Sequence, residues 1–184
     1  MNKKDISKKR SGKTGSGVDS QTGYPEMDLL NRELQKMIED TDYSLSYSKP
    51  VAKMDFISFV ADKLLVIEVI RKGIPYSMFD VIQKFFPFSM NDWADYLGLS
   101  GKSLHRYKQQ NKSFKSIHSE KIIELAEVTE KGVDVFGDPG KFRLWLDTPL
   151  FSLGKQKPFD LLKDSYGKEM IMAELIRIEH GIMI

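Results

Sequence analysis

The sequence predicts an all-α protein, and three observations lead to this prediction. From Tyr24 onward, apolar residues recur every three or four positions, which is the spacing of one helix face. No stretch shows the sustained alternation of apolar and polar residues that is typical of a half-buried strand. Residues that cap or end helices, mainly Ser, Asp, Gly and Pro, separate the apolar runs. We therefore expect a series of helices joined by short connections.

The first 23 residues are expected to lie outside the folded core. Residues 1–23 contain six Lys and Arg against two Asp, and very few aliphatic side chains. Such a segment buries too little apolar surface to offset the entropy that ordering costs. The segment is expected to be a disordered tail, or alternatively a basic arm that adds non-specific affinity for DNA.

Two helices are predicted next. A stripe of Leu, Met and Ile side chains predicts the first from Pro25 to about Thr41, within a unit that covers residues 24–50 together with a connection. The second is predicted over residues 55–72, where a broad apolar face is followed by Gly73. Glycine commonly ends a helix because it adopts the left-handed backbone conformation without strain.

Two polar pairs predict where the following two helices begin. Ser77 with Asp80, and Ser89 with Asp92, have the spacing of an N-cap residue and an acidic partner three positions later. The helices expected from these pairs cover residues 78–86 and 90–97.

A long helix is predicted over residues 117–136, with Ser116 as its cap and a cluster of Gly, Asp and Pro after it. We place a domain boundary at this cluster, between a DNA-binding domain over 51–136 and a second domain over 137–184. Three shorter helices are expected in the second domain, over residues 141–147, 158–163 and 166–179.

Residues 91–110 have the spacing of a helix-turn-helix. Ala94 is small where two helices must cross closely, and Gly98 stands four residues later, where the turn needs a residue that tolerates positive φ. Leu104 and Tyr107 continue the buried side of the second helix. The alternative interpretation is a compact helical hairpin with a glycine turn and no role in binding DNA.

The segment after this turn carries basic charge only. Between Gly98 and His118 there are five Lys and Arg and no Asp or Glu, although the formal net charge of the whole chain is only +2. A segment of one sign on the expected recognition helix favours a surface that faces phosphates over an ordinary solvated face. The candidate DNA-binding residues are Ser100, Lys102, His105, Arg106, Gln109, Lys112 and Lys115.

The chemistry of these side chains suggests a division of roles. Arg106 and Lys102 are suited to guanine edges, and Gln109 is suited to adenine. Lys112 and Lys115 lie past the helix and are expected to hold phosphates. Because a helix-turn-helix usually binds as a dimer, we expect a homodimer on a two-fold related operator.

The last predicted helix is more apolar than one domain core requires. Apolar side chains occupy most of its circumference between Met170 and Ile178, and the apolar segment 182–184 follows. This surplus predicts a surface that another protein covers. The alternative is that these residues complete the domain core or a homodimer.

A set of motifs in the C-terminal three-fifths of the chain has a specific order and spacing. The set comprises Gly73-Ile74-Pro75, Leu104, Arg106, Ser119, Val135-Phe136-Gly137, Trp145-Leu146, Pro149, Leu153-Gly154, Pro158, Asp160-Leu161-Leu162, Gly167 and Arg177-Ile178-Glu179-His180-Gly181. In these residues the chain resembles the Xre/MbcA/ParS family of antitoxins, whose members join an Xre-like helix-turn-helix to a toxin-binding domain. It departs from the family pattern at Phe142-Arg143 and at Lys155-Gln156-Lys157.

The resemblance implies a type II antitoxin that neutralises a RES-domain toxin, an NAD-degrading enzyme, and that represses their shared operon by binding operator DNA. It also implies that the C-terminal region occludes the active site of the toxin. Carried onto this chain, the toxin-binding candidates are Arg177, Glu179, His180, Ile182, Met183 and Ile184. The alternative function is a stand-alone dimeric transcriptional regulator with no toxin partner.

Motifs of enzymes and metal sites are missing from the sequence. His105, His118 and His180 fall on three different expected elements and lack the spacing of metal ligands. We therefore expect no catalysis, no metal and no cofactor. The chain has no cysteine, no apolar run of about 18 residues and no apolar segment that would complete a signal peptide. These features predict a cytoplasmic protein that does not engage membranes.

Overall fold

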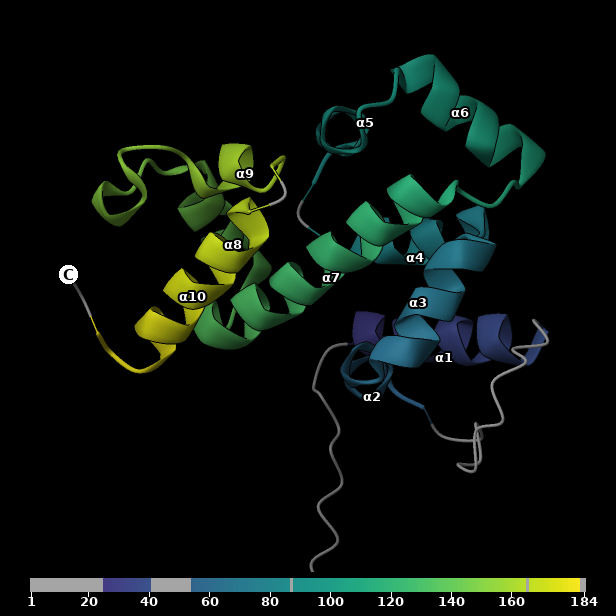
Figure 1. Cartoon of the computed structure of the whole chain (residues 1–184), viewed down its shortest axis with the longest axis horizontal. Helices are drawn as coiled ribbons and strands as arrows, with labels where there is room; N and C mark the ends of the chain where they lie inside the picture. Colours follow the sequence, from purple (N-terminus) through teal and green to yellow (C-terminus); the bar gives the residue numbers. More distant parts are fainter. Residues whose placement is uncertain (1–24, 41–53, 87, 165, 183–184) are drawn as a thin grey trace, which may run out of the picture.

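The computed structural model of the protein describes residues 25–40, 54–86, 88–164 and 166–182 (Figure 1). Within these ranges all regular elements are helices, which confirms the all-α prediction. In chain order they are α1 (Pro25–Asp40), α2 (Phe56–Ala61), α3 (Lys63–Lys72), α4 (Tyr76–Phe85), α5 (Met90–Leu97), α6 (Gly101–Gln110), α7 (Ser116–Phe136), α8 (Pro139–Asp147), the 3-10 helix η2 (Phe151–Leu153), α9 (Pro158–Leu161) and α10 (Gly167–Glu179). The expected tail over 1–23, the connection after α1, and Met183 and Ile184 lie outside the described residues. No described helix is both long and apolar enough to cross a membrane.

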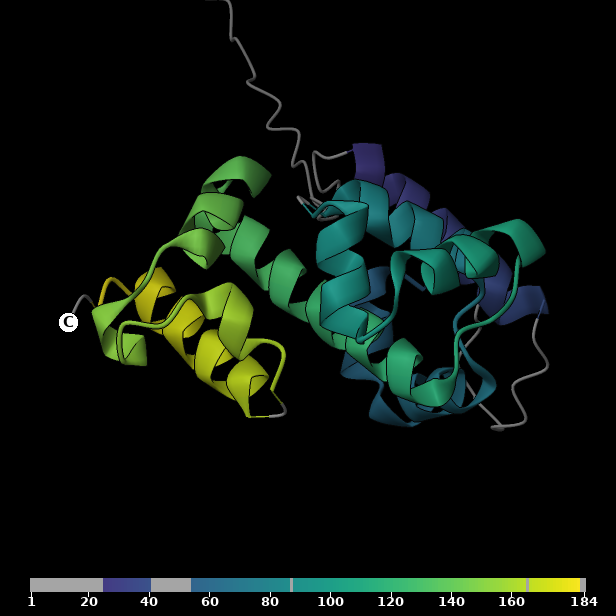
Figure 2. The ribbon, with the colours of Figure 1, turned by 90° about the horizontal axis from the view of Figure 1, so that it is seen from above.

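The long helix α7 is shared by the two halves of the molecule (Figures 1 and 2). Its first half packs against α3 and α5, whereas its last turns pack against α8 and α10. Its buried side is continuous, because Ile122, Ala126 and Thr129 are all fully buried. The expected domain boundary after Phe136 falls where α7 ends, and the domain limits themselves stay a prediction.

The N-terminal half has an aromatic core covered by α1. The Phe79 ring lies between Trp93 and Phe114, with ring centroids 5.0 Å apart in both pairs. On the other side of α4, helix α1 buries Leu30 and Leu34 almost completely. Helix α1 is therefore an integral part of this half.

The single helix expected over residues 55–72 is in fact two helices. Asp62 leaves the helical backbone region, with φ −90° and ψ 86°, and separates α2 from α3. Its side chain accepts a hydrogen bond from the Leu65 N–H and caps α3. The prediction that this segment ends at Gly73 is confirmed.

Two helix starts also differ from the sequence prediction by one or two residues. Helix α4 begins at Tyr76, directly after Pro75, and Ser77 lies inside the helix and does not cap it. Proline suits a helix start because the N–H that it lacks would have no partner there. Helix α7 begins at Ser116 itself, with Lys115 as the N-cap residue and no capping side-chain bond.

The C-terminal half is a small three-helix unit against the end of α7. Gly137 ends α7 in the left-handed conformation, and Asp138 caps α8 by accepting a hydrogen bond from the Lys141 N–H. Helix α10 lies along α7 and buries Ile171 and Leu175 completely. The three predicted helices of this half are confirmed within a few residues at their ends.

Candidate nucleic-acid interface and partner-binding surface

Helices α5 and α6 form the predicted helix-turn-helix. The capping box at the start of α5 is present, since the Asp92 N–H donates to the Ser89 hydroxyl and the Ser89 N–H donates to the Asp92 carboxylate. Gly98 ends α5 at φ 64° and ψ 32°, in the left-handed region. A Cβ added at Gly98 would meet no atom within 4 Å, so the backbone conformation is what favours glycine there. Ser100 then caps α6 through the Ser103 N–H.

The inner side of α6 is fixed by one aliphatic and one aromatic residue. Leu104 is 1% exposed, as predicted. Tyr107 is only partly buried, and its ring stacks on the buried Phe114 with centroids 4.4 Å apart and planes 16° apart. Tyr107 therefore lies at the rim of the core, with one part of the ring open to the surface.

The chain after α6 is held by a buried serine. The Phe114 N–H donates to the Ile74 carbonyl at 2.8 Å, and the Ile74 N–H donates to the Ser119 hydroxyl at 2.9 Å. The Ser119 hydroxyl donates in turn to the Phe114 carbonyl at 3.3 Å. A Cβ on Gly73, which has φ 91°, would overlap that carbonyl. These contacts fix the backbone of residues 113–115 against the core.

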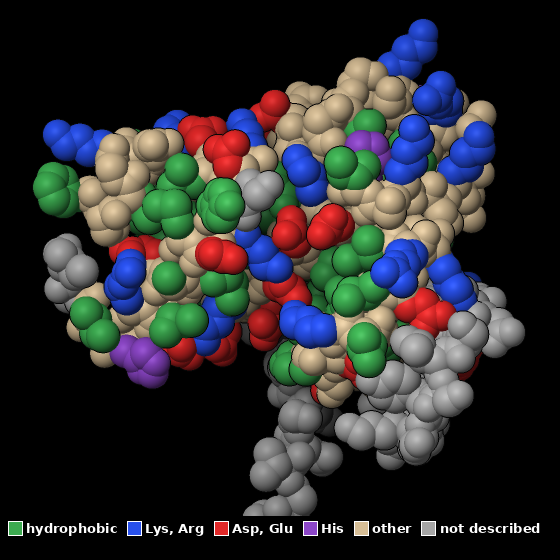
Figure 3. Space-filling model, viewed as in Figure 1, with side chains coloured by type: hydrophobic (Ala, Val, Ile, Leu, Met, Phe, Trp, Pro, Cys, Tyr) green, Lys and Arg blue, Asp and Glu red, His purple; other side chains and the backbone are tan. Residues whose placement is uncertain are grey.

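All seven candidate DNA-binding side chains are exposed on this part of the molecule. They are Ser100, Lys102, His105, Arg106, Gln109, Lys112 and Lys115. None of the four basic residues among them forms an ion pair with another described residue. Figure 3 shows Lys and Arg side chains gathered over α6 on the face in view, with no acidic side chain among them. The surface is therefore positive and available to an anionic partner.

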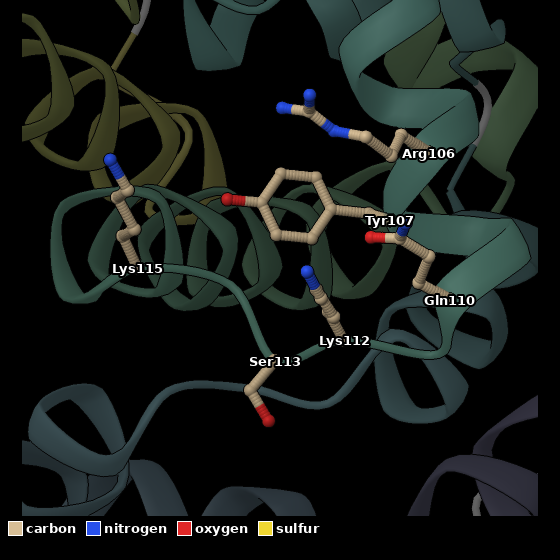
Figure 4. Close-up of a pocket in the computed structure, with 6 residues that line it drawn as sticks. All are labelled: Arg106, Tyr107, Gln110, Lys112, Ser113 and Lys115. Atoms are coloured by element: carbon tan, nitrogen blue, oxygen red, sulfur yellow. The ribbon is translucent and has the colours of Figure 1, made fainter.

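A cavity of about 410 Å³ lies at the end of α6 (Figure 4). It is lined by Arg106, Tyr107, Gln110, Lys112, Ser113 and Lys115. The Tyr107 ring stands in the middle of the lining, and the three basic side chains surround it from different sides. With three cations and no carboxylate, the cavity can accept an anionic group such as a phosphate.

The pKa of the nearby His118 is lowered by burial and in part by basic side chains around this surface. Burial lowers the pKa of His118, and the neighbouring Lys115 and Lys121 lower it further. His118 is therefore more readily neutral than an ordinary histidine, and adds no charge of its own near neutral pH.

The predicted toxin-binding residues lie at the end of α10. Arg177, Glu179 and His180 are exposed, and Ile182 is 55% exposed. Two of them have partners on the protein: Arg177 pairs with Glu174 at 2.6 Å, and Glu179 pairs with Lys131 at 2.7 Å. The ion pairs orient these charged groups at the surface.

The outer face of α10 carries the apolar surplus that the sequence predicts. Met170 is 43% exposed and Ile176 is 44% exposed, on the side opposite to the buried Ile171 and Leu175. Figure 3 shows apolar side chains over α10 on the face in view. The described part of the chain does not cover them.

Phe151 and Leu144 are two of the exposed large hydrophobic side chains of the C-terminal half that sequence reasoning missed. Phe151 is 82% exposed and Leu144 is 70% exposed. The signal that would have found Phe151 is its place in a short turn-rich segment between Pro149 and Gly154, where few buried positions are available.

Sequence reasoning also missed the role of Arg143, although it noted Phe142-Arg143 as unusual. Arg143 of α8 donates to Asp92 of α5 at 3.0 Å and to Asp147 at 2.6 Å. Its guanidinium lies 5.1 Å from the Phe88 ring centroid and 5.2 Å from that of Phe159. Arg143 thereby connects the C-terminal half to the helix-turn-helix.

Comparison with protein families gives two matches. Residues 65–127 match the Antitoxin Xre-like helix-turn-helix domain, and residues 131–181 match the Antitoxin Xre/MbcA/ParS C-terminal toxin-binding domain. Helices α1 and α2 precede both matches.

Two curated relatives are similar over most of the same region, and each is named Antitoxin Xre. The relative from Photorhabdus laumondii is 29% identical over 116 residues, which cover 62% of this chain and 78% of the relative. The relative from Yersinia enterocolitica is 28% identical over 119 residues, which cover 64% of this chain and 80% of the relative.

Proposed function

Since the chain belongs to the Xre/MbcA/ParS family of antitoxins, we propose that it neutralises a RES-domain toxin that degrades NAD and that it represses the operon encoding both proteins. The observation that carries the proposal is the presence of a helix-turn-helix and a toxin-binding domain in one chain. In this proposal the chain blocks the toxin and binds the operator. No catalytic step, metal or cofactor is assigned to it. The proposal requires the cytoplasm, where operator and newly made toxin meet.

On the DNA side, α6 enters the major groove as the recognition helix of a homodimer. Lys102 and Arg106 contact guanine edges, and Gln109 contacts adenine. Lys112 and Lys115, beside the cavity at the end of α6, hold phosphates of the backbone. The exposure of all these side chains and the absence of acidic residues over α6 support this assignment.

The DNA assignment is tested by the salt dependence of operator binding. If the dimer contacts about five phosphates, log K falls against log salt with a slope of roughly −4 to −5. Lys112→Gln is expected to weaken binding to all sequences alike and to make the slope shallower by roughly one unit per protomer. Gln109→Ala is expected to change the sequence preference and leave the slope unchanged. Lys36→Gln, on the exposed side of α1, is the control, and a slope near zero for the unaltered protein contradicts the assignment.

On the toxin side, the end of α10 and the residues after it enter the active-site entrance of the toxin and exclude the dinucleotide. The candidates are Arg177, Glu179, His180, Ile182, Met183 and Ile184. The exposure of the first four supports this role. Deletion of residues 177–184 is expected to abolish neutralisation and to leave operator binding intact. Intact inhibition after that deletion contradicts the occlusion mechanism.

The first measurement is a pull-down of the full-length chain from its native cytoplasm, followed by an NAD-depletion assay of any protein released from it. A partner that consumes NAD when free and is inactive in the complex supports the antitoxin proposal. Recovery of the chain alone, or with DNA only, favours the stand-alone dimeric regulator instead.

A further inference from the structure

Phe151 is held in solvent by the fold. Among the described residues it is the most exposed of the large apolar side chains, at 82%. It follows α8 at the start of the loop 150–157, which closes with an isolated bridge between Leu150 and Gln156. An exposed aromatic ring in an ordered loop is unusual, because soluble proteins bury rings of this size or use them to bind partners.

The loop is ordered by its own hydrogen bonds and not by the Phe151 ring. The Lys155 N–H donates to the Leu150 carbonyl at 2.8 Å, and the Leu150 N–H donates to the Gln156 carbonyl at 3.1 Å. Leu153 anchors the loop in the core at 4% exposure. Lys155 holds a φ of 63°, which a residue with a side chain adopts only where its surroundings impose it. The backbone that carries the ring is therefore held in a fixed position.

A shared carboxylate connects this loop to the predicted toxin-binding end of α10. The Ser152 hydroxyl donates to one oxygen of Glu174 at 2.7 Å, and Arg177 donates to the other at 2.6 Å. The Glu174 side chain is only 13% exposed between them. Met170, one turn earlier on α10, is partly exposed on the same helix. Figures 1 and 2 both place the loop and the end of α10 at the same end of the molecule.

We propose that Phe151 is an anchor residue that inserts into an apolar pocket of the toxin, beside the active-site entrance that the chain terminus occludes. The inference rests on the proposed function, because it names the toxin as the occupant of this surface. Its location supports this occupant, since Phe151 lies within residues 131–181, which match the toxin-binding domain.

The chemistry of the surface defines the pocket that it fits. Aromatic side chains are typical centres of protein interfaces, and an anchor on an already ordered backbone loses less entropy on binding than one on a segment that must first fold. Lys155 and Lys157 are exposed in the same loop and pair with no described acidic residue. The matching toxin pocket is therefore apolar at its base and acidic at its rim.

The test measures the affinity of the full-length chain for the toxin recovered in the pull-down. Phe151→Ala is expected to raise Kd about thirtyfold or more, which is the effect of removing an interface anchor. Phe151→Leu, which keeps an apolar group, is expected to raise Kd by less than about tenfold. Tyr166→Ala is the matched control, because that ring is 79% exposed at the opposite end of α10, and its effect is expected to stay within about threefold.

Two results overturn the inference. One is a Phe151→Ala protein whose affinity for the toxin stays within about threefold of the unaltered chain. The other is a Tyr166→Ala protein that loses as much affinity for the toxin as Phe151→Ala does. The loss would then be the effect of removing any exposed ring and would not identify Phe151 as the anchor. Since Phe151 contributes little to the core, the variant is expected to keep the operator affinity and the unfolding midpoint of the unaltered protein.

Hydroxyl-radical labelling of the unaltered protein gives a second readout that needs no substitution. Formation of the complex is expected to protect Phe151 and to leave Tyr166 labelled as in the free chain. A complex in which Phe151 is labelled as before overturns the inference and leaves the occlusion mechanism standing. If the unaltered chain binds no toxin at all, the proposed function fails, and the inference fails with it.

Discussion

At the scale of single residues, Gly132 sets how closely two helices approach. A Cβ added at Gly132 on α7 would overlap the ring of Phe142 on α8. The Phe142 side chain is fully buried, and its ring stacks on the neighbouring Phe136 and Trp145 with centroids 6.2 and 6.0 Å away. The missing side chain therefore lets α8 pack directly on the backbone of α7.

Replacing Gly132 by alanine is expected to destabilise the protein, although alanine normally favours a helix. In an open helix interior the change would stabilise by up to about 1 kcal/mol, but overpacking here is expected to lower the free energy of unfolding by about 1–3 kcal/mol. Urea unfolding measures the difference. Gly101→Ala is the control, because that glycine is also helical and a Cβ there meets nothing within 4 Å. Equal stability of the two variants would show that Phe142 moves aside freely.

Some residue roles are not accessible from the sequence because the partner is remote in the chain. Ser119 was identified only through the family resemblance. Its structural role is to accept a hydrogen bond from the Ile74 N–H, which lies 45 positions earlier in the chain. Arg143 was noted only as a departure from the family pattern. Its hydrogen bond to Asp92 joins residues 51 positions apart. Periodicity and capping patterns describe neighbours along one helix, so neither contact leaves a local signal.

At the scale of elements, the local capping pattern was correct at Ser89 and wrong at Ser77, because Pro75 starts α4 before Ser77. The capping box of Ser89 and Asp92 and the turn at Gly98 involve residues within four positions of one another, and both are confirmed. The break at Asp62 was missed because the apolar stripe continues on both sides of it, and periodicity alone does not show that an aspartate caps a new helix. The candidate site residues were selected by charge and spacing, and the structure finds all of the DNA-binding set exposed.

Asp92 connects two elements, because its carboxylate caps α5 and also accepts a hydrogen bond from Arg143 of α8. Burial alone would raise the pKa of Asp92, but hydrogen bonds from the Ser89 N–H, Arg143 and the Ser89 hydroxyl lower it below the ordinary value. The charged form is thus favoured in the folded protein. Its stabilising effect is present above the pKa of an unfolded aspartate and is lost as pH falls through the lowered native pKa.

Asp92→Asn is expected to lower the free energy of unfolding by about 1 kcal/mol at pH 7, because it weakens a cap and removes an ion pair. The difference from the unaltered protein is expected to shrink as pH falls below about 4, the pKa of an unfolded aspartate, and to disappear once the pH has passed the lowered native pKa. Urea unfolding at a series of pH values measures this. Asp147→Asn keeps the contact between the halves and is expected to cost about 0.5 kcal/mol or less. If the stability difference between Asp92→Asn and the unaltered protein grew in acid, the stabilising role assigned to the Asp92 carboxylate would be contradicted.

At the scale of the whole molecule, three sets of contacts join the two halves across α7. Glu127 of α7 accepts from Lys63 of α3 at 2.9 Å and also binds Lys168 of α10. Arg143 bonds Asp92, and Lys163 pairs with Asp95 of α5 at 2.6 Å. Because these contacts join the two halves and α7 runs uninterrupted through both, loss of structure in one half is expected to expose part of the other.

The two halves are therefore expected to unfold together. The protein has one tryptophan in each half, the buried Trp93 and the partly buried Trp145, so incorporation of fluorotryptophan gives one ¹⁹F signal for each half without any substitution. In a urea titration both signals are expected to change at the same midpoint.

A substitution in α1 makes the test of joint unfolding sharper. Leu34→Ala leaves a cavity under α1 and is expected to cost about 2–5 kcal/mol, because Leu34 is fully buried at the far side of the N-terminal half. Joint unfolding requires the Trp145 signal to shift to lower urea as far as the Trp93 signal does. Lys36→Ala, on the exposed side of the same helix, is expected to move neither signal. If the Trp145 midpoint stayed at its original value while that of Trp93 fell, α7 would divide the molecule into two independent units, and the contacts of Glu127 and Arg143 would not couple them.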